Sequence, residues 1–169
     1  MTASEAMTAR EVAITTTCST AKEFVDRFFK RLDEERHTVK NMYEETGKCI
    51  FNGHCYVGPD NIGKLYENIP KSSTRVVGFD AHQLDDYLGG APTILITVTG
   101  HVRYGKKGDG GGFDANGNAT EVKSMDFYET FIITGKSGSW RIQSDNFRFQ
   151  NCNTDSMLKS DLWNISMQE

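Results

Sequence analysis

The sequence predicts an α+β domain in which helices cover one face of a strongly curved antiparallel sheet. Within the domain, helical periodicity occurs in residues 20–70, and long alternating strands occupy residues 75–150. An Asn-Gly dipeptide at 52–53, between two apolar segments, marks a hairpin interleaved with the helices. Helices segregated from strands are typical of α+β domains, so one sheet face should hold the helices and the other should stay open.

Length and composition favour one globular domain with a tail at each end. The chain has 169 residues and a net charge of −4, and 37% of it is hydrophobic. We expect residues 1–16 to form a disordered tail, residues 17–150 the domain and residues 151–169 a C-terminal extension. No apolar segment is long enough to span a membrane, and the first residues lack the pattern of a signal peptide.

Three helices are expected in the N-terminal part. The first covers residues 20–36, the second covers residues 39–45 and ends at Gly47, and the third covers residues 61–68 and ends at Pro70. The first helix has a continuous apolar face at three- and four-residue spacing, formed by Phe24, Val25, Phe28, Phe29 and Leu32.

The remaining elements are predicted to be strands. Four long strands follow the hairpin of residues 49–57, at residues 75–84, 93–104, 122–134 and 140–150. A glycine-rich and charged loop fills residues 105–121. The four cysteines match no zinc-ligand spacing, and we expect neither a metal nor a cofactor.

The last strand has two unlike faces. Phe147 and Phe149 point one way, whereas Asn146, Arg148 and Gln150 point the other way. An aromatic strand face normally packs on a core. The opposite face carries one arginine between two uncharged amides, which differs from the mixed charges of most exposed strands. We interpret this face as a protein–protein interface.

Alternation in the two long strands before it extends the predicted interface. The side chains expected on the same open face are Thr97, Thr99, His101, Tyr128, Thr130 and Ile132. Phe127, Phe131 and Ile133 should face the core. Glu129 shares their inner face, so we expect it either at a solvated mouth of the sheet or paired with a buried polar group.

The order of elements, together with four motifs, resembles the nuclear transport factor 2 family. The motifs are the helix segment Ala21-Lys-Glu-Phe-Val, Ile50-Phe-Asn-Gly, the helix end Ile69-Pro and Ser144-Asp-Asn-Phe-Arg-Phe-Gln. The resemblance covers residues 21–150 and implies a cone, in which a bent antiparallel sheet wraps around one long and two shorter helices. It is closer to the small subunits of heterodimeric mRNA export receptors than to the Ran carriers. The carriers have an acidic residue at the position of Asn52, and acids where residues 101–107 of this chain are basic.

The resemblance also implies a function. It implies a non-enzymatic subunit that binds the matching domain of the large mRNA export receptor through its open sheet face, with Arg148 pairing an acid of the partner. Contact with phenylalanine-glycine nucleoporins and with mRNA is then expected to be indirect. The protein would move between nucleus and cytoplasm through the nuclear pore.

Two alternatives remain open at the level of the sequence. The same cone fold hosts small-molecule enzymes, and the candidate groups here are Asp145, Glu129, Tyr43, Tyr56 and His54, which form no spacing that demands chemistry. A homodimeric adaptor could use the same open face, although a two-fold axis would bring two copies of Arg148 together.

Overall fold

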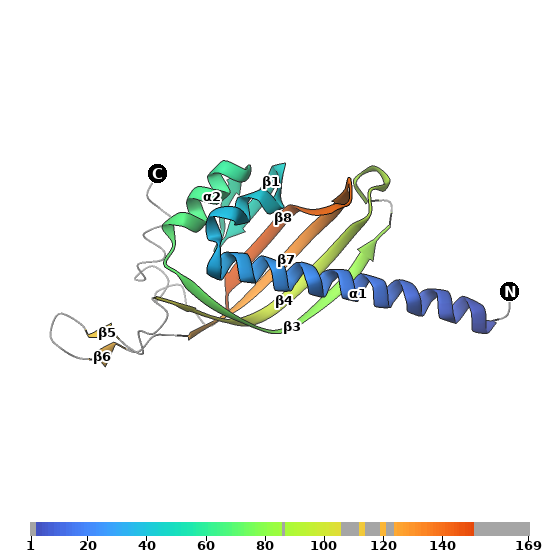
Figure 1. The fold of residues 1–169 in the computed structure, drawn as a ribbon, viewed down its shortest axis with the longest axis horizontal. Helices are drawn as coiled ribbons and strands as arrows, with labels where there is room; N and C mark the ends of the chain where they lie inside the picture. Colours follow the sequence, from blue (N-terminus) through green and yellow to red (C-terminus); the bar gives the residue numbers. More distant parts are fainter. Residues whose placement is uncertain (1–2, 86, 106–111, 114–118, 121–123, 151–169) are drawn as a thin grey trace.

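The computed structural model describes residues 3–85, 87–105, 112–113, 119–120 and 124–150. Three helical segments pack on one face of a curved six-stranded sheet that does not close into a barrel (Figure 1). The strand order is β2-β1-β8-β7-β4-β3, so β2 and β3 form the two edges. All neighbouring pairs are antiparallel except β1 and β8, which run parallel. The expected antiparallel sheet is therefore mixed.

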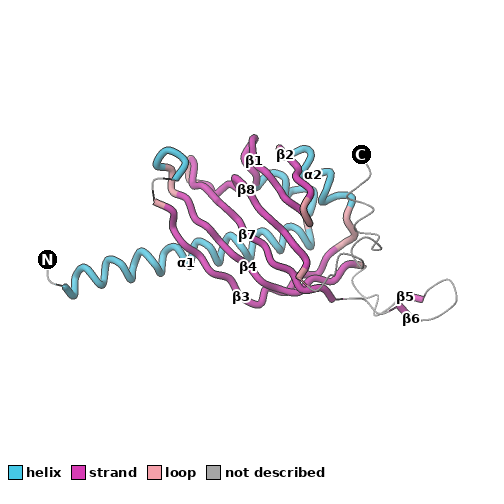
Figure 2. The backbone as a smooth tube through the Cα atoms, turned by 180° about the vertical axis from the view of Figure 1, so that it is seen from behind, coloured by secondary structure: helices cyan, strands magenta, loops and turns pink. Residues whose placement is uncertain are grey.

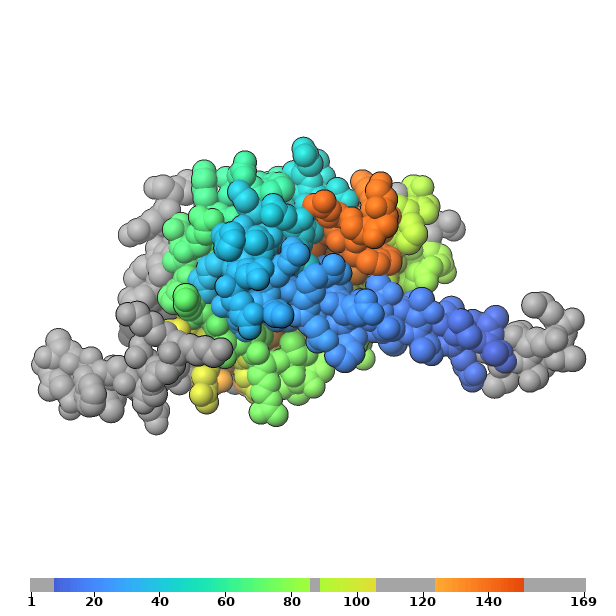
Figure 3. Space-filling view, viewed as in Figure 1, coloured from blue at the N-terminus to red at the C-terminus, as the bar shows by residue number. Residues whose placement is uncertain are grey.

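The long helix α1 (Ala3–Glu34) crosses the sheet and forms the centre of the core. Its predicted apolar face is buried, with Phe24 and Phe28 fully inaccessible to solvent. The helix is longer than the expected residues 20–36, because residues 3–16, expected to form a disordered tail, are its first turns. Residues 8–16 are exposed, and this end of α1 projects beyond the sheet (Figures 1 and 3).

The second segment differs from the prediction. A 3-10 helix, η1 (Arg36–Met42), replaces the helix expected at residues 39–45, and strand β1 (Tyr43–Phe51) begins directly after it. Gly47 ends no helix and lies inside β1. A side chain there would meet the carbonyl oxygens of Glu44 and Ile142, at 2.8 and 3.0 Å from the added Cβ. Glycine therefore allows the close approach of β1 to β8.

The hairpin and the third helix confirm their sequence signals. Strand β2 (His54–Val57) follows Asn52 and Gly53, whose positive φ angles of 48° and 91° suit a tight hairpin turn. Helix α2 (Pro59–Asn68) starts two residues before the expected residue 61 and stops before Pro70.

Four long strands form the rest of the sheet, and all four were predicted. They are β3 (Ser72–Leu84), β4 (Thr93–Tyr104), β7 (Ser124–Lys136) and β8 (Ser139–Phe149). A short 3-10 helix, η2 (Tyr87–Gly90), joins β3 to β4. Within the loop expected at residues 105–121, strands β5 (Gly112–Phe113) and β6 (Ala119–Thr120) pair with each other. The expected extension 151–169 lies outside the described residues.

The two faces of the sheet have different environments. The helices cover the inner face, and Figure 3 shows that side of the molecule. The view from behind shows the strands in front of α1, and no helix of the described residues lies across them (Figure 2). We call this second side the outer face. Phe127, Phe131 and Ile133 of β7 point inward and are at most 1% exposed, as the alternation predicts.

Within the described ranges, no helix is long and apolar enough to cross a membrane. The same residues contain no group of three or more His, Cys, Asp or Glu side chains arranged to hold a metal ion.

Candidate protein–protein interface

Strand β8 presents the predicted arginine on the outer face. Arg148 and Asn146 are exposed, whereas Phe147 and Phe149 are only 5% and 6% exposed and pack in the core. Phe147 stacks on Phe51, with ring centroids 4.8 Å apart and planes 5° apart. Aromatic packing on the inner face thus fixes the direction in which Arg148 points.

The hairpin turn holds this end of β8 in place. The Asn52 backbone amide donates to the Phe147 carbonyl at 3.0 Å, and its side-chain Oδ1 accepts from the Phe149 amide at 3.1 Å. Asn52 is 8% exposed, so both hydrogen bonds are shielded from water. The two residues that flank Arg148 are therefore both bonded to Asn52. Gln150 is exposed just beyond the strand, and its backbone amide donates to the backbone carbonyl of Asp126 at 2.8 Å.

The register between β4 and β7 brings the other predicted residues beside this arginine. Thr97 lies opposite Thr130, Thr99 opposite Tyr128, and Tyr128 opposite Arg148 on β8. His101 lies at the end of the same face and Ile132 toward its other end. All nine residues predicted for the interface therefore share the outer side of the sheet, and they lie on three neighbouring strands or directly after β8.

Side-chain contacts on the outer face order part of it before any partner binds. The Thr130 hydroxyl donates to the Tyr128 hydroxyl at 2.9 Å. A second contact joins His101 Nδ1 to the Asp126 carboxylate. Side chains fixed in advance lose less conformational entropy on binding, which favours association.

Sequence reasoning missed several residues of this face. Leu95 lies opposite Ile132, Asp126 lies opposite His101, and Ile50 of β1 lies opposite Asn146. Alternation already placed Leu95 and Asp126 on the outer side, and the same rule could have added them. Ile50 required knowledge that β1 pairs with the last strand, and no local pattern carries that information.

The outer face suits protein binding better than chemistry. It combines hydroxyl, apolar and aromatic side chains with exposed arginines on a broad curved surface, and Tyr and Arg are enriched in binding hot spots. Two stacked sheet faces of this size would bury more than about 1,600 Å², the range of stable complexes.

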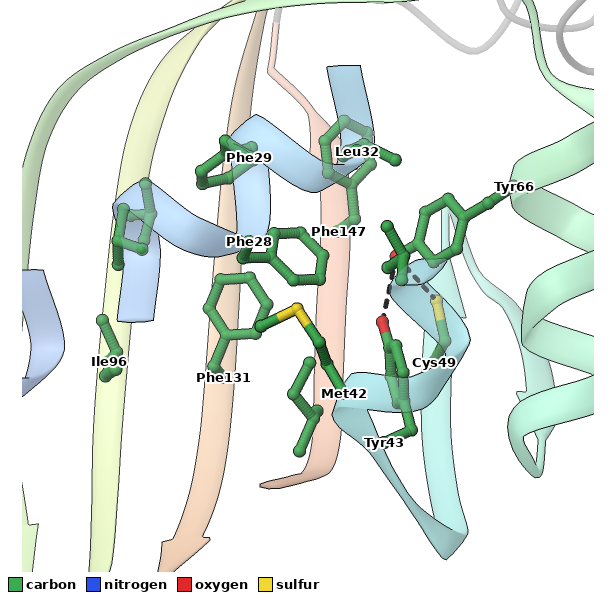
Figure 4. Packing of buried hydrophobic residues seen from close by; sticks show 14 of the residues in the cluster. Phe28, Phe29, Leu32, Met42, Tyr43, Cys49, Tyr66, Ile96, Phe131 and Phe147 are labelled. Atoms are coloured by element: carbon green, nitrogen blue, oxygen red, sulfur yellow. Dashed lines mark hydrogen bonds between the residues drawn. The ribbon is translucent and has the colours of Figure 1, made fainter. Parts of the chain in front are cut away.

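A second group of polar residues lies on the inner face, behind the central strands. The Tyr43 hydroxyl donates to Asp145 Oδ2 at 2.8 Å, and the Tyr66 hydroxyl lies 3.0 Å from that of Tyr43. The Cys49 sulfur lies 3.7 Å from the Tyr66 hydroxyl (Figure 4). Asp145 also shares a hydrogen bond with Glu129, and both carboxyl groups are 1% exposed. Glu129 thus pairs with a buried polar group, one of the two outcomes expected for it.

Burial controls the protonation of this inner cluster. Loss of solvation, followed by the charge of Asp145, holds the pKa of Glu129 well above its usual value. Burial raises the pKa of Asp145 from 3.8 to about 6, and hydrogen bonds from Tyr43 and Glu129 oppose that rise. The raised pKa favours the protonated form of Glu129, which is the form that can donate to the Asp145 carboxylate.

The candidate enzyme residues are only partly brought together. Asp145, Glu129 and Tyr43 join the inner cluster, whereas His54 and Tyr56 lie on the edge strand β2. Tyr66 and Cys49 complete the cluster, and sequence reasoning did not select them. The cluster is shielded from solvent, with no member more than 2% exposed.

Comparisons with a family model, with related proteins and with solved structures agree with one another. The model of the nuclear transport factor 2 (NTF2) domain matches residues 20–149. NTF2-related export protein 1 of Bos taurus is 27% identical over 138 residues, which cover 79% of this chain and 88% of that protein.

Two solved structures share the fold. Nuclear transport factor 2 of Cryptosporidium parvum superposes with a TM-score of 0.61 at 16% identity, covering 79% of this chain and 94% of that one. A chain of the Candida albicans Mtr2–Mex67 M domain complex superposes with a TM-score of 0.57 at 16% identity, covering 83% and 99%.

Proposed function

The chain belongs to the nuclear transport factor 2 family, and we propose that it is a non-enzymatic accessory subunit of an mRNA export receptor. It forms a heterodimer with the large receptor subunit, whose matching domain packs on the outer face of this sheet. The observation that carries the proposal is Arg148, exposed on a central strand of a face that none of the described helices covers. Relatives named NTF2-related export proteins support a role in nuclear export.

Arg148 determines the choice of partner in this proposal. Stacking of two sheet faces removes the guanidinium from water, and an acid on the partner has to replace that solvation. The net gain from such a buried pair is small, because desolvation offsets much of the attraction. A partner without the acid would leave a buried unpaired charge, so the pair acts mainly through specificity.

The inner cluster supports a structural role more than a catalytic one. An acid–tyrosine group can catalyse proton transfer only if a substrate reaches it. Asp145 and Glu129 are only 1% exposed, so both carboxyl groups are shielded from solvent. We therefore assign these groups to the interior of a binding subunit.

A homodimer through the outer face is less favourable. A two-fold axis would bring two copies of Arg148 close together, and each would still need an acid. Within the described residues, the ion pair nearest to Arg148 along the strand register joins His101 and Asp126. Asp126 therefore already has a cationic neighbour when the histidine is protonated. A different chain with an acidic residue at this place fits the face better.

The transport role follows from the heterodimer. The large subunit carries the contacts with phenylalanine-glycine nucleoporins and with mRNA, and this chain stabilises the domain it binds. The complex therefore moves between the nucleus and the cytoplasm, and this chain contributes indirectly to cargo binding.

The test compares two charge reversals of the same kind on opposite sides of the molecule. Arg148→Glu and Arg27→Glu, on the exposed side of α1, are used beside the wild type to capture partners from nuclear extract. Binding to the purified large subunit is then measured by calorimetry. We expect Arg148→Glu to weaken the complex by several kcal/mol, because it places like charges together, and Arg27→Glu to bind as the wild type does. Intact binding by Arg148→Glu would refute the interface, and recovery of only the chain itself would favour the homodimer.

A further inference from the structure

Two arginines, Arg75 and Arg103, lie diagonally across strands β3 and β4 at one corner of the outer face, and Arg148 lies three strands away from β3 on the same face. Arg75 of β3 lies opposite His101 of β4, and Arg103 follows His101 by two residues on the same side of β4. Arg148 lies opposite Tyr128, which is two residues from Asp126. Opposite side chains in neighbouring strands are about 5 Å apart at Cβ, and next-nearest ones about 7 Å apart. The corner thus lies where β3 begins and where β4 and β8 end.

The charge of this corner differs from that of the whole chain. Arg75, Arg103 and Arg148 are all exposed, and none of them joins an ion pair with another described residue. Asp126, the acid that the described residues place beside this corner, already contacts His101. Among the described residues of this corner, Arg75 and Arg103 therefore outnumber the one neighbouring acid, although the chain as a whole carries −4.

Like charges held together on a sheet destabilise one another, and an acidic partner removes this cost. Guanidinium groups also bind carboxylates through two parallel hydrogen bonds, which gives them directional specificity. The corner is continuous with the row of Thr99, Tyr128 and Arg148 in the proposed interface. A segment of the same partner can therefore reach both regions.

We propose that this corner binds an acidic peptide segment of the partner subunit, with carboxylates facing Arg75 and Arg103 in addition to the one facing Arg148. The inference rests on the proposed heterodimer and names a second contact within it. A polypeptide fits better than a nucleic acid, because a phosphate chain extending past the corner would meet a molecule of net charge −4. The corner thus determines which partner sequences bind and accelerates their association.

The test removes charge without reversing it. The double variant Arg75→Gln/Arg103→Gln is compared with Arg27→Gln/Lys30→Gln, which removes two exposed positive charges from α1. Affinity and association rate for the purified large subunit are measured at low and high salt. We expect the corner variant to bind about tenfold more weakly at low salt, and the difference to shrink at high salt, where screening weakens exposed ion pairs. The α1 variant should match the wild type under both conditions.

A cross-linking experiment identifies the segment itself. Arg75→Lys/Arg103→Lys keeps the charge and adds amines that carbodiimide joins to carboxylates at zero length. We expect links from these positions to aspartates or glutamates of the large subunit, found by mass spectrometry.

Each outcome separates the two proposals. Wild-type affinity and an unchanged salt dependence in Arg75→Gln/Arg103→Gln, with binding lost in Arg148→Glu, would overturn the corner and leave the heterodimer standing. Failure of the wild type to bind the receptor would overturn both. A corner variant that loses affinity for single-stranded oligouridine, but not for the receptor, would make the corner an RNA site and overturn this inference.

Discussion

At the scale of single residues, the inner cluster shows how a polar group can be kept inside an apolar core. Asp145 Oδ2 accepts from the Tyr43 hydroxyl, whereas the Oδ1 atom of Asp145 and the Oε2 atom of Glu129 have no hydrogen-bond donor unless the two acids share a proton. A buried carboxylate with unused acceptors is costly, so the structure holds a proton between the two acids. The result is a core whose stability depends on pH.

We predict that this pair makes the fold less stable as the pH rises. The folded-state pKa of Asp145, about 6, lies above its usual value of 3.8, so the folded state binds protons that the unfolded state releases. The contribution is present below pH 4 and is lost as the pH rises through 6, by about 3 kcal/mol for a shift of two units. Glu129, whose pKa is raised in the same direction, extends the loss to higher pH.

The measurement is urea unfolding from pH 4 to pH 8 for the wild type and for Glu129→Gln/Asp145→Asn, which removes both ionisable groups. The wild type should lose stability relative to the double variant as the pH rises. Glu67→Gln, on the exposed side of α2, serves as the control and should follow the wild type. Parallel curves for the wild type and the double variant would contradict the shared proton.

At the scale of elements, the sequence predicted the features that are determined by residues close together in the chain. The structure confirms the Asn-Gly turn, the end of the third helix before Pro70 and the alternation of β4. The helix expected at residues 39–45 was wrong, because Val39 and Met42 occupy a 3-10 turn while Tyr43 is extended and pairs with Ile142. That pairing spans about a hundred residues, and local periodicity carries no trace of it.

In the candidate site, too, the features set by local sequence were predicted and those set by strand pairing were not. Alternation placed Arg148 and Tyr128 on the outer face and Glu129 inside, because it needs only the direction of each strand. The partner of Glu129 could not be predicted, because it follows from the register between β7 and β8, which includes a shift near Ile133. The early start of α1 was missed because residues 3–16 lack the apolar spacing of a packed helix.

We predict that Asn52 couples the hairpin turn to the end of β8. Asn52→Gly keeps the positive φ angle and removes the acceptor of the Phe149 amide, which leaves a buried donor unpaired at a cost of about 1–3 kcal/mol. Amide exchange at Phe149 should accelerate, and affinity for the large subunit should fall because Arg148 is less firmly held. Ser137→Gly, at the other turn residue with positive φ, is the control and should have little effect on either measurement. Unchanged exchange at Phe149 would show that β1 pairing alone holds the strand.

At the scale of the whole molecule, folding and binding are assigned to opposite sides of one sheet. The buried apolar residues form one cluster between the sheet and the helices, and the proposed interface lies entirely on the outer face. Because strand residues alternate, adjacent positions on a central strand serve different purposes. The free chain should therefore fold on its own and keep its outer face available.

We predict that two adjacent alanine substitutions on β7 separate these purposes. Phe127 is 1% exposed and stacks on Phe147, so Phe127→Ala should cost about 3–5 kcal/mol of folding stability. Tyr128 lies on the outer face, so Tyr128→Ala should change the unfolding free energy of the isolated chain by less than about 1 kcal/mol and weaken the heterodimer by about 2 kcal/mol or more. Denaturant unfolding of the free chain and calorimetry with the large subunit measure the two quantities on the same proteins. Equal loss of stability in both variants would mean that the outer face contributes to folding, and the isolated chain would then depend on its partner to fold.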